Sequence, residues 1–397
     1  MAATAPQSSS IPAKPPVWRN PEIRAVVFQI LVLGSIILMG VFLVNNTMAN
    51  LERQGIASGF GFLNTTAGFN IGETLIEYSE EDTYGRAFFV GLLNTIQVSI
   101  IGVFFATILG FVVGLARLSS NWLIARLATV YIEVLRNIPP LLQIFFWYFA
   151  VLRPLPGPKQ SIEMFGVMFL NNRGLSAPKA IYEDGFGLIV GAFVIAIIVI
   201  VFLRHWAHKR QDETGQQFPV FLSSLGILIG LLLLAAVFTG FPMTWEHPIL
   251  KGFNYQGGMV LSPELVALSL ALSTYTASFI AEIVRAGVLA VNKGQTEAAL
   301  ALGLTNGQNT RLVIIPQALR VIIPPLTSQY LNLTKNSSLA AAIAYPDIVL
   351  VFAGTTLMQT GQAVEIMGIT LAVYLTLSLL ISAFMNWYNN KMALVER

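Results

Sequence analysis

The stretch "FGLIVGAFVIAIIVIVFL", residues 186–203, contains no charged side chain. An apolar run of about 20 residues is long enough to cross the hydrocarbon core of a bilayer as a helix. Similar runs recur along the 397 residues, of which 55% are hydrophobic and 11% charged. Soluble domains carry roughly 25% charged residues, so the composition predicts a polytopic membrane protein. Because an open sheet cannot satisfy its backbone in lipid, we expect an all-α fold.

The apolar runs predict about eight transmembrane helices. Their approximate ranges are 24–46, 84–116, 122–152, 186–204, 220–241, 263–288, 318–345 and 366–388. The first run begins too late and is too long for a cleavable signal peptide, so we interpret it as a retained span. Residues 1–23 are rich in Ala, Ser and Pro, which predicts a disordered tail. The long connections 47–83 and 153–185 could hold short surface helices or simply be loops.

The basic residues predict the orientation of the spans. With the N-terminus inside, the cytosolic segments hold 14 of the 23 Lys and Arg residues and the outer segments hold 7, while Arg136 and Lys335 fall within spans. The first outer connection is acidic instead, with Glu73, Glu77, Glu80, Glu81 and Asp82. Because basic residues favour the cytosolic side, both termini are expected there, including a short tail at 391–397.

A polar segment, "EAALALGLTNGQNTRLVIIP" at 297–316, separates the sixth and seventh spans on the expected cytosolic side. Thr296 is suited to cap a short helix that starts at Glu297. Gly303 permits a break or a close approach, and Asn306-Gly307 is a turn signal. A short rigid helix here would suit force transfer to a soluble partner. An interfacial helix without any partner fits the same spacing.

This segment resembles the EAA loop of ABC-importer permeases. The matching residues are Glu297, Ala298, Ala299, Gly303, Ile314 and Pro316. The resemblance implies that the loop, 293–316, forms a coupling helix that sits in a groove of an ATP-binding subunit. Three further segments, 131–149, 277–303 and 316–339, resemble the polar amino-acid permeases, most closely the longer Q-type subunit of general L-amino-acid uptake systems. One departure is "NIPP" at 137–140, where that subfamily often has Gly-Thr-Pro-Leu.

The resemblance implies a type I importer core at 84–152 and 262–390. It leaves 24–83 as an extra first span with its outer loop, and 153–261 as an insert with an outer loop and two extra spans. It also implies a bacterial inner-membrane complex that works by alternating access. The implied partners are a second related permease, two ATP-binding subunits that hold ATP and Mg, and a periplasmic amino-acid-binding protein.

The third span carries charge at membrane depth beside a proline pair. Glu133 and Arg136 are three residues apart and can pair, which would lessen the cost of burying charge. Neither Pro139 nor Pro140 can donate a backbone hydrogen bond, so the carbonyls of Leu135 and Arg136 lose their helical partners. In transporters such broken helices often line a water-filled cavity. The alternative is a kinked helix stabilised by an internal ion pair.

Other spans carry polar stripes at helical spacing. Lys335 on the seventh span could meet a substrate carboxylate, or could neutralise an acid such as Glu133. The candidate translocation path comprises Asn94, Gln97, Glu133, Arg136, Thr274, Ser278, Glu282, Ser328, Asn332 and Lys335.

Motifs of catalysis and cofactor binding are missing from the sequence. Gly-Lys does not occur, so there is no phosphate loop of the G-x-x-x-x-G-K-[ST] type, and ATP would have to act on a separate chain. The three His are scattered and Cys is absent, so no metal or cofactor site is expected on this chain. A net charge of +3 does not favour nucleic acid. The alternatives to an ATP-driven permease are an ion-gradient-driven secondary transporter and an integral membrane enzyme.

Overall fold

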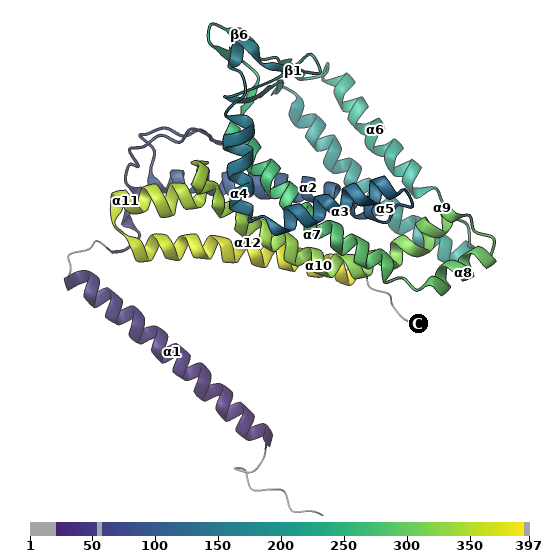
Figure 1. Cartoon of the computed structure of the whole chain (residues 1–397), viewed down its shortest axis with the longest axis horizontal. Helices are drawn as coiled ribbons and strands as arrows, with labels where there is room; N and C mark the ends of the chain where they lie inside the picture. The colour runs from purple at the N-terminus through teal and green to yellow at the C-terminus, as the bar shows by residue number, and fades with distance from the viewer. Residues whose placement is uncertain (1–20, 54–57, 393–397) are drawn as a thin grey trace, which may run out of the picture.

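The computed structural model describes residues 21–53 and 58–392. The predicted tails fall largely outside this range, at 1–20 and 393–397. The long helices are α1 (Pro21–Arg53), α2 (Tyr84–Arg117), α3 (Trp122–Asn137), α5 (Phe186–Thr214), α6 (Val220–Phe238), α7 (Pro263–Leu289), α10 (Ile315–Asn336) and α12 (Ala363–Met392). Within the described residues, seven helices are long and apolar enough to cross a membrane, and a bent pair makes up to eight. The prediction of a helical membrane protein with about eight spans is confirmed (Figure 1), although the chain also contains short strands.

The third span is not one continuous helix. α3 ends at Asn137, and the chain continues as α4 (Pro140–Phe145) and the π-helix η3 (Phe146–Leu152), bent by 107° from α3. The span predicted over 122–152 is therefore a broken one, interrupted at the predicted proline pair. The proline pair causes the break. Neither Pro139 nor Pro140 has an N–H to donate, and a proline ring disfavours helical geometry in the residue before it.

Short helical elements complete the chain around the long helices. They are η2 (Gly61–Asn64), η4 (Pro158–Gln160), α8 (Lys293–Ala301), α9 (Asn306–Asn309), η5 (Thr310–Ile314), η6 (Ser337–Ile343), η7 (Val349–Thr356) and α11 (Leu357–Thr360). The seventh predicted span, 318–345, thus ends as the 3-10 helix η6 instead of continuing as α-helix.

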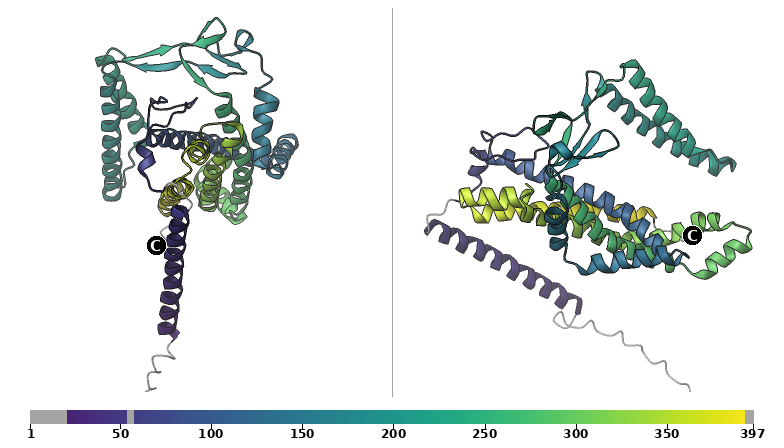
Figure 2. Two further views of the ribbon diagram at one scale, coloured as in Figure 1. Left: turned by 90° about the vertical axis from the view of Figure 1, so that its left-hand side faces the viewer. Right: turned by 45° about the horizontal axis from the view of Figure 1, so that its top comes forward.

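The insert contains strands, where sequence reasoning considered only loops or surface helices. They are β1 (Ile162–Met164), β2 (Met168–Asn171), β3 (Gly174–Ala177), β4 (Lys179–Tyr182), β5 (Met243–Glu246), β6 (Ile249–Lys251), β7 (Asn254–Gln256) and β8 (Met259–Leu261). They form antiparallel sheets of order β1-β2-β3-β8, β4-β5 and β6-β7. Because β3 pairs with β8 and β4 with β5, the sheets join the segments before α5 and after α6. Figure 2 shows them above the helical core, joining the α5–α6 hairpin to η3.

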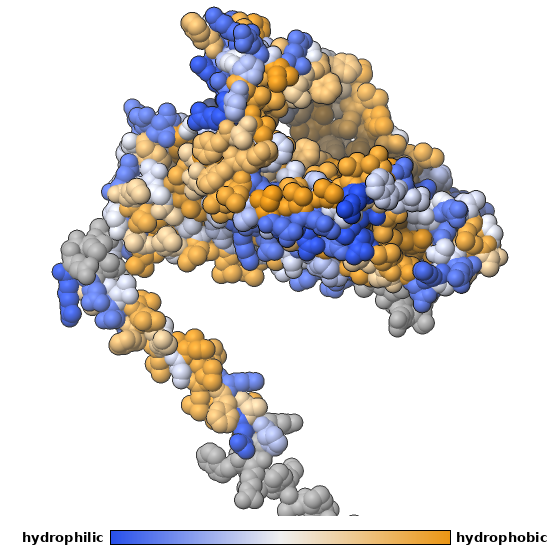
Figure 3. Space-filling view, in the orientation of Figure 1, coloured by the Kyte–Doolittle hydropathy of each residue, from blue (hydrophilic) through white to orange (hydrophobic). Residues whose placement is uncertain are grey.

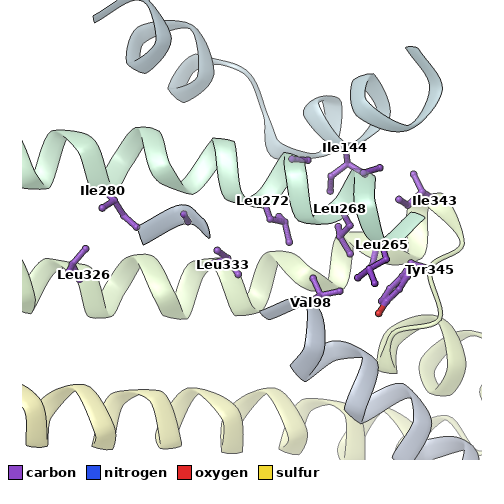
Figure 4. Close-up of a cluster of buried hydrophobic side chains, with 14 of the residues drawn as sticks. Val98, Ile144, Leu265, Leu268, Leu272, Ile280, Leu326, Leu333, Ile343 and Tyr345 are labelled. Carbon is purple, nitrogen blue, oxygen red and sulfur yellow. The ribbon is translucent and has the colours of Figure 1, made fainter. Parts of the chain in front are cut away.

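The core lies between α2, α7 and α10. Leu268 and Leu272 of α7 and Leu333 of α10 are fully buried, and Figure 4 shows them meeting between these two helices. The axes of α2 and α7 approach closely because α2 has glycine at the contact. A Cβ added at Gly114 would lie 2.6 Å from the Ala281 carbonyl oxygen. Small residues of this kind allow membrane helices to pack backbone to backbone.

The extra spans are far more exposed than the core. None of the membrane-length window of α1 is buried, against 6% of the windows of α5 and α6 and 56% of that of α7. α5 and α6 pack against each other, where Ala196, Ala207 and Ser224 are buried. Their remaining apolar side chains point outward, as expected for surfaces that lie in lipid.

Candidate translocation site and coupling segment

A polar cavity of about 410 Å³ opens between α2, α3 and α7. Its lining residues are Arg117, Ile132, Glu133, Arg136, Asn137, Phe279 and Glu282. Three predicted path residues, Glu133, Arg136 and Glu282, meet here. Arg117, Asn137 and Phe279 were absent from the predicted path, although Asn137 follows Glu133 by one helical turn, a spacing visible in the sequence.

Glu282 already has two cationic partners. The Arg117 guanidinium donates to one of its oxygens, and Arg285 Nη2 donates to Oε1 over 2.5 Å. Charge-assisted bonds of this kind hold a carboxylate in one orientation. Glu282 therefore fixes the end of α2 to α7, and its charge is compensated inside the protein.

The side chains of Glu133 and Arg136 differ from Glu282 in their partners. Within the described residues neither takes part in an ion pair, so the predicted internal pair is not formed. The Arg136 guanidinium lies 4.9 Å from the centre of the Phe279 ring, which is cation–π geometry. Asn137 Nδ2 donates to the Glu133 carbonyl oxygen over 2.7 Å. The cavity thus presents one carboxylate and one guanidinium with no charged partner among the described residues.

The break beside this cavity is bridged by a side chain. Gln143 Nε2 donates to the carbonyl oxygens of Leu135, over 2.8 Å, and of Ile138, over 3.0 Å. The Leu135 carbonyl is one of the two predicted to lose a helical partner. Sequence reasoning missed the role of Gln143, although its place four residues after Pro139 was visible in the sequence.

Asn94 and Gln97 belong to a different cluster, near the end of α2 that faces the acidic first loop. Asn94 Nδ2 donates to the carbonyl oxygens of Glu73 and Pro346, both over 2.9 Å. The Tyr345 hydroxyl donates to Gln97 Oε1 over 3.2 Å. This cluster ties the first loop and the chain after η6 onto α2.

Glu73 extends the same cluster to α7. Its carboxylate accepts a hydrogen bond from the hydroxyl of Ser262, the residue that caps α7. Burial raises the pKa of Glu73 above its usual range, the Ser262 bond opposes this shift, and the nearby charge of Glu264 adds to it. The first loop is therefore tied to α7 by a carboxyl group whose burial favours its protonated form.

Two predicted residues of α7 point away from the polar cavity. Thr274 lines an apolar cavity of about 580 Å³ against α2, and its carbonyl oxygen accepts from the Tyr131 hydroxyl over 2.8 Å. Ser278 is fully buried, and its hydroxyl donates to the Tyr275 carbonyl oxygen over 2.6 Å. Such bonds within a helix are common where membrane helices pack.

The stripe of Ser328, Asn332 and Lys335 is exposed along α10. Lys335 lines a groove of about 390 Å³ with Ser338 and Tyr374. In the described chain it forms no ion pair, so the proposed partnership with Glu133 is not seen. Figure 3 shows hydrophilic surface beside apolar surface on the face of the molecule that Figure 1 presents. A charge at membrane depth, such as that of Lys335, must face protein or water, because exposure to lipid is costly.

The segment between α7 and α10 is helical, but its helices begin at other residues than predicted. α8 begins at Lys293, where the Asn292 side chain caps it in place of Thr296. Gly303 has φ +81°, a left-handed conformation that favours glycine, and the chain leaves α8 there. The predicted turn at Asn306-Gly307 is instead the start of α9, whose Thr305 and Gln308 form a capping box.

The six residues of the E-A-A pattern are spread along this segment, from α8 to the start of α10. Glu297 and Ala298 are exposed on α8, and Ala299 is buried. Ile314 ends the π-helix η5, and Pro316 stands in the first turn of α10, which continues directly from η5. The segment thus presents α8, with Glu297 exposed, at the end of the molecule (Figure 1).

Residues 102–394 match the protein family described as the inner membrane component of binding-protein-dependent transport systems. The chain belongs to this family. It is 56% identical over 380 residues to the putative amino-acid ABC transporter permease YhdX of Escherichia coli, covering 96% of this chain and 97% of YhdX. It is also 56% identical to the general L-amino acid transport system permease AapQ of Rhizobium johnstonii, covering 95% and 94% of the two chains.

A third relative is 42% identical, with 94% of this chain and 95% of the relative covered. It is the glutamate/glutamine/aspartate/asparagine transport permease BztB of Rhodobacter capsulatus. The predicted resemblance of the chain to the amino-acid permeases of ABC importers is thereby confirmed. The chain is a multi-pass membrane permease subunit.

Proposed function

We propose that this permease carries polar L-amino acids across the inner membrane by alternating access, as part of an ATP-driven importer. The observation that supports this most directly is that Glu133 and Arg136 line the cavity between α2, α3 and α7, and that neither forms an ion pair among the described residues. The names of the similar permeases, each an amino-acid transporter, support the same substrate class.

The charges of the cavity match the groups that all α-amino acids share. A guanidinium binds a carboxylate through paired hydrogen bonds, so Arg136 suits the α-carboxylate of the substrate. Glu133 suits the α-ammonium group, and Asn137 adds an amide at the same helix turn. Because Glu282 is occupied by Arg117 and Arg285, it does not compete for the ammonium group. Recognition through the α-groups would make the cavity tolerant of different side chains.

The exposed stripe on α10 supports a second, related permease subunit as partner. Lys335 and Asn332 lie along a helix that would otherwise face lipid, and a second permease would cover them. The translocation path would then run between the two subunits. The cavity between α2, α3 and α7 would open onto this path from one side.

Energy would come from two ATP-binding subunits, which would hold ATP and Mg, since this sequence has no phosphate loop. We propose that α8, through Glu297 and its neighbours, docks in these subunits as the coupling helix. A periplasmic amino-acid-binding protein would deliver substrate on the other side. This assignment places both termini in the cytosol and the permease core at 84–152 and 262–390, with 24–83 and 153–261 as additions.

The test uses the whole complex in proteoliposomes, with the binding protein outside and ATP supplied to the ATP-binding subunits. Arg136→Gln and Glu133→Gln are each expected to lower amino-acid uptake at least tenfold while the complex still assembles. Arg126→Gln is the matched control, because Arg126 lies on the same helix but does not line the cavity. Uptake that is unchanged in both cavity variants would overturn the assignment.

A further inference from the structure

The break between α3 and α4 lacks the backbone hydrogen bonds that hold a helix together. Ile138 (φ −99°, ψ 125°) and Pro139 (φ −53°, ψ 140°) are extended, so the ladder of helical hydrogen bonds is interrupted. Pro139 and Pro140 supply no N–H to restore it. Backbone bonds resume only inside α4, where Leu142 N and Gln143 N donate to the Pro139 carbonyl oxygen. A bend of 107° across such a joint needs another restraint.

The Gln143 side chain supplies that restraint from the far side of the break. Its Nε2 donates to one carbonyl in the last turn of α3, Leu135, and to one within the joint, Ile138. The residue is 4% exposed, so these bonds lie in a medium of low dielectric constant, where they are strong and where unpaired carbonyls are costly. The next residue, Ile144, is fully buried in the core cluster with α7, which anchors the start of α4.

The same last turn of α3 carries the polar side chains of the cavity. Arg136 follows Leu135 directly, and Glu133 and Asn137 lie within two residues of it. Any rotation of this turn relative to α4 and α7 would move the carboxylate and the guanidinium together.

We propose that Gln143 is a positioning residue that locks the 107° break and thereby holds Glu133, Arg136 and Asn137 in place around the cavity. The lock itself depends only on the contacts of this chain, whereas its effect on transport rests on the function proposed above. Only the donor atom Nε2 makes the lock; Oε1 is buried and makes no hydrogen bond among the described residues.

The absence of cysteine allows the angle to be measured directly. Spin labels on cysteines at Leu127 of α3 and Phe149 of η3, both exposed, would report the distance across the break in the reconstituted complex. We expect one narrow distance distribution in the otherwise unchanged chain. Gln143→Met, which keeps the length of the side chain but removes the donor, should broaden it clearly. Leu142→Met is the control, because it places the same residue one position earlier, on an exposed site.

Transport kinetics separate positioning from folding. Gln143→Met should raise the KM for amino-acid uptake several-fold in complexes that assemble and hydrolyse ATP normally. If Gln143→Met fails to assemble, Gln143→Glu keeps the polarity of the site and donates only when its carboxyl is protonated. Its distance distribution should then narrow on acidification.

Two outcomes overturn the lock: a distribution as narrow in Gln143→Met as in the parent chain, or one that is narrow in Gln143→Glu at every pH. A broadened distribution with unchanged uptake would leave the lock standing. It would instead contradict the cavity as the substrate site.

Discussion

The carboxylate of Glu282 on α7 accepts a hydrogen bond from the guanidinium of Arg117, the last residue of α2, although 165 residues separate the two in sequence. Arg285, one turn further along α7, holds the same carboxylate from the other side. Together with the glycine contacts between α2 and α7, this makes the two helices one unit. Movement during transport is therefore expected in the elements around this unit, not within it.

The first prediction concerns this ion pair. Glu282→Gln should lower the thermal stability of the purified complex modestly, by roughly 1 kcal/mol, because the pair is partly exposed and solvent screens it. Arg117→Gln should have a smaller effect, because Arg285 still holds Glu282, and the double variant should be no worse than Glu282→Gln alone. Melting temperatures of the parent complex, the two single variants and the double variant complete a double-mutant cycle. Effects that simply add would show that the two side chains act independently.

The second prediction concerns the close approach of α2 and α7. Gly114→Val should prevent assembly or destabilise the chain by about 1–3 kcal/mol or more, since even its Cβ would overlap Ala281 and Val284. Gly191→Val is the matched control, because a Cβ at Gly191 on α5 meets no atom within 4 Å. Yield and melting temperature in detergent would distinguish the two. Equal tolerance at both positions would contradict the packing described here.

The third prediction concerns α8. Glu297→Lys should reduce copurification of the ATP-binding subunits and uptake at least severalfold while membrane insertion is unaffected, because the residue is exposed and outside the spans. Glu213→Lys, an equivalent charge reversal at the end of α5, should leave both unchanged. If the two variants retain the ATP-binding subunits equally well, α8 is not the coupling helix.

The fourth prediction concerns the acidic first loop. The pKa of Glu73 is raised in the folded protein, so the folded state binds its proton more tightly than the unfolded state does. The contribution of this group to stability is therefore fully present below its unfolded pKa, about 4.5, and is lost as the pH rises through the folded pKa. Melting temperatures measured from pH 4 upward should show this decline in the parent chain, and Glu73→Gln should flatten it. A decline of the same size in Glu73→Gln would assign it to other groups.

Local patterns in the sequence were enough to predict the spans, the break and the E-A-A segment. Apolar length marks a span, and a proline pair such as Pro139-Pro140 interrupts a helix wherever it occurs. What interrupts the helix was therefore predictable. The angle of the break and its restraint by Gln143 were not, because they depend on where a side chain points in three dimensions.

Contacts between distant segments account for most of the errors. Glu133 and Arg136 satisfy the spacing of an ion pair, yet Arg136 turns to Phe279, which lies 143 positions later in the sequence. The predicted translocation path included Glu282 but not Arg117, its ion-pair partner. The strands of the insert are only three or four residues long, too short for a clear alternating pattern. Two of their pairings, β3 with β8 and β4 with β5, also join segments on opposite sides of the α5–α6 hairpin.

The most direct test of the central claim is uptake of labelled amino acids into proteoliposomes that contain the complete complex. Two conditions are compared: ATP supplied to the ATP-binding subunits with no ion gradient, and an imposed ion gradient without ATP. We predict uptake only with ATP, with inhibition by unlabelled α-amino acids and little by their N-acetyl or amide derivatives. Uptake that follows the gradient in the absence of ATP would contradict the account and identify a secondary transporter.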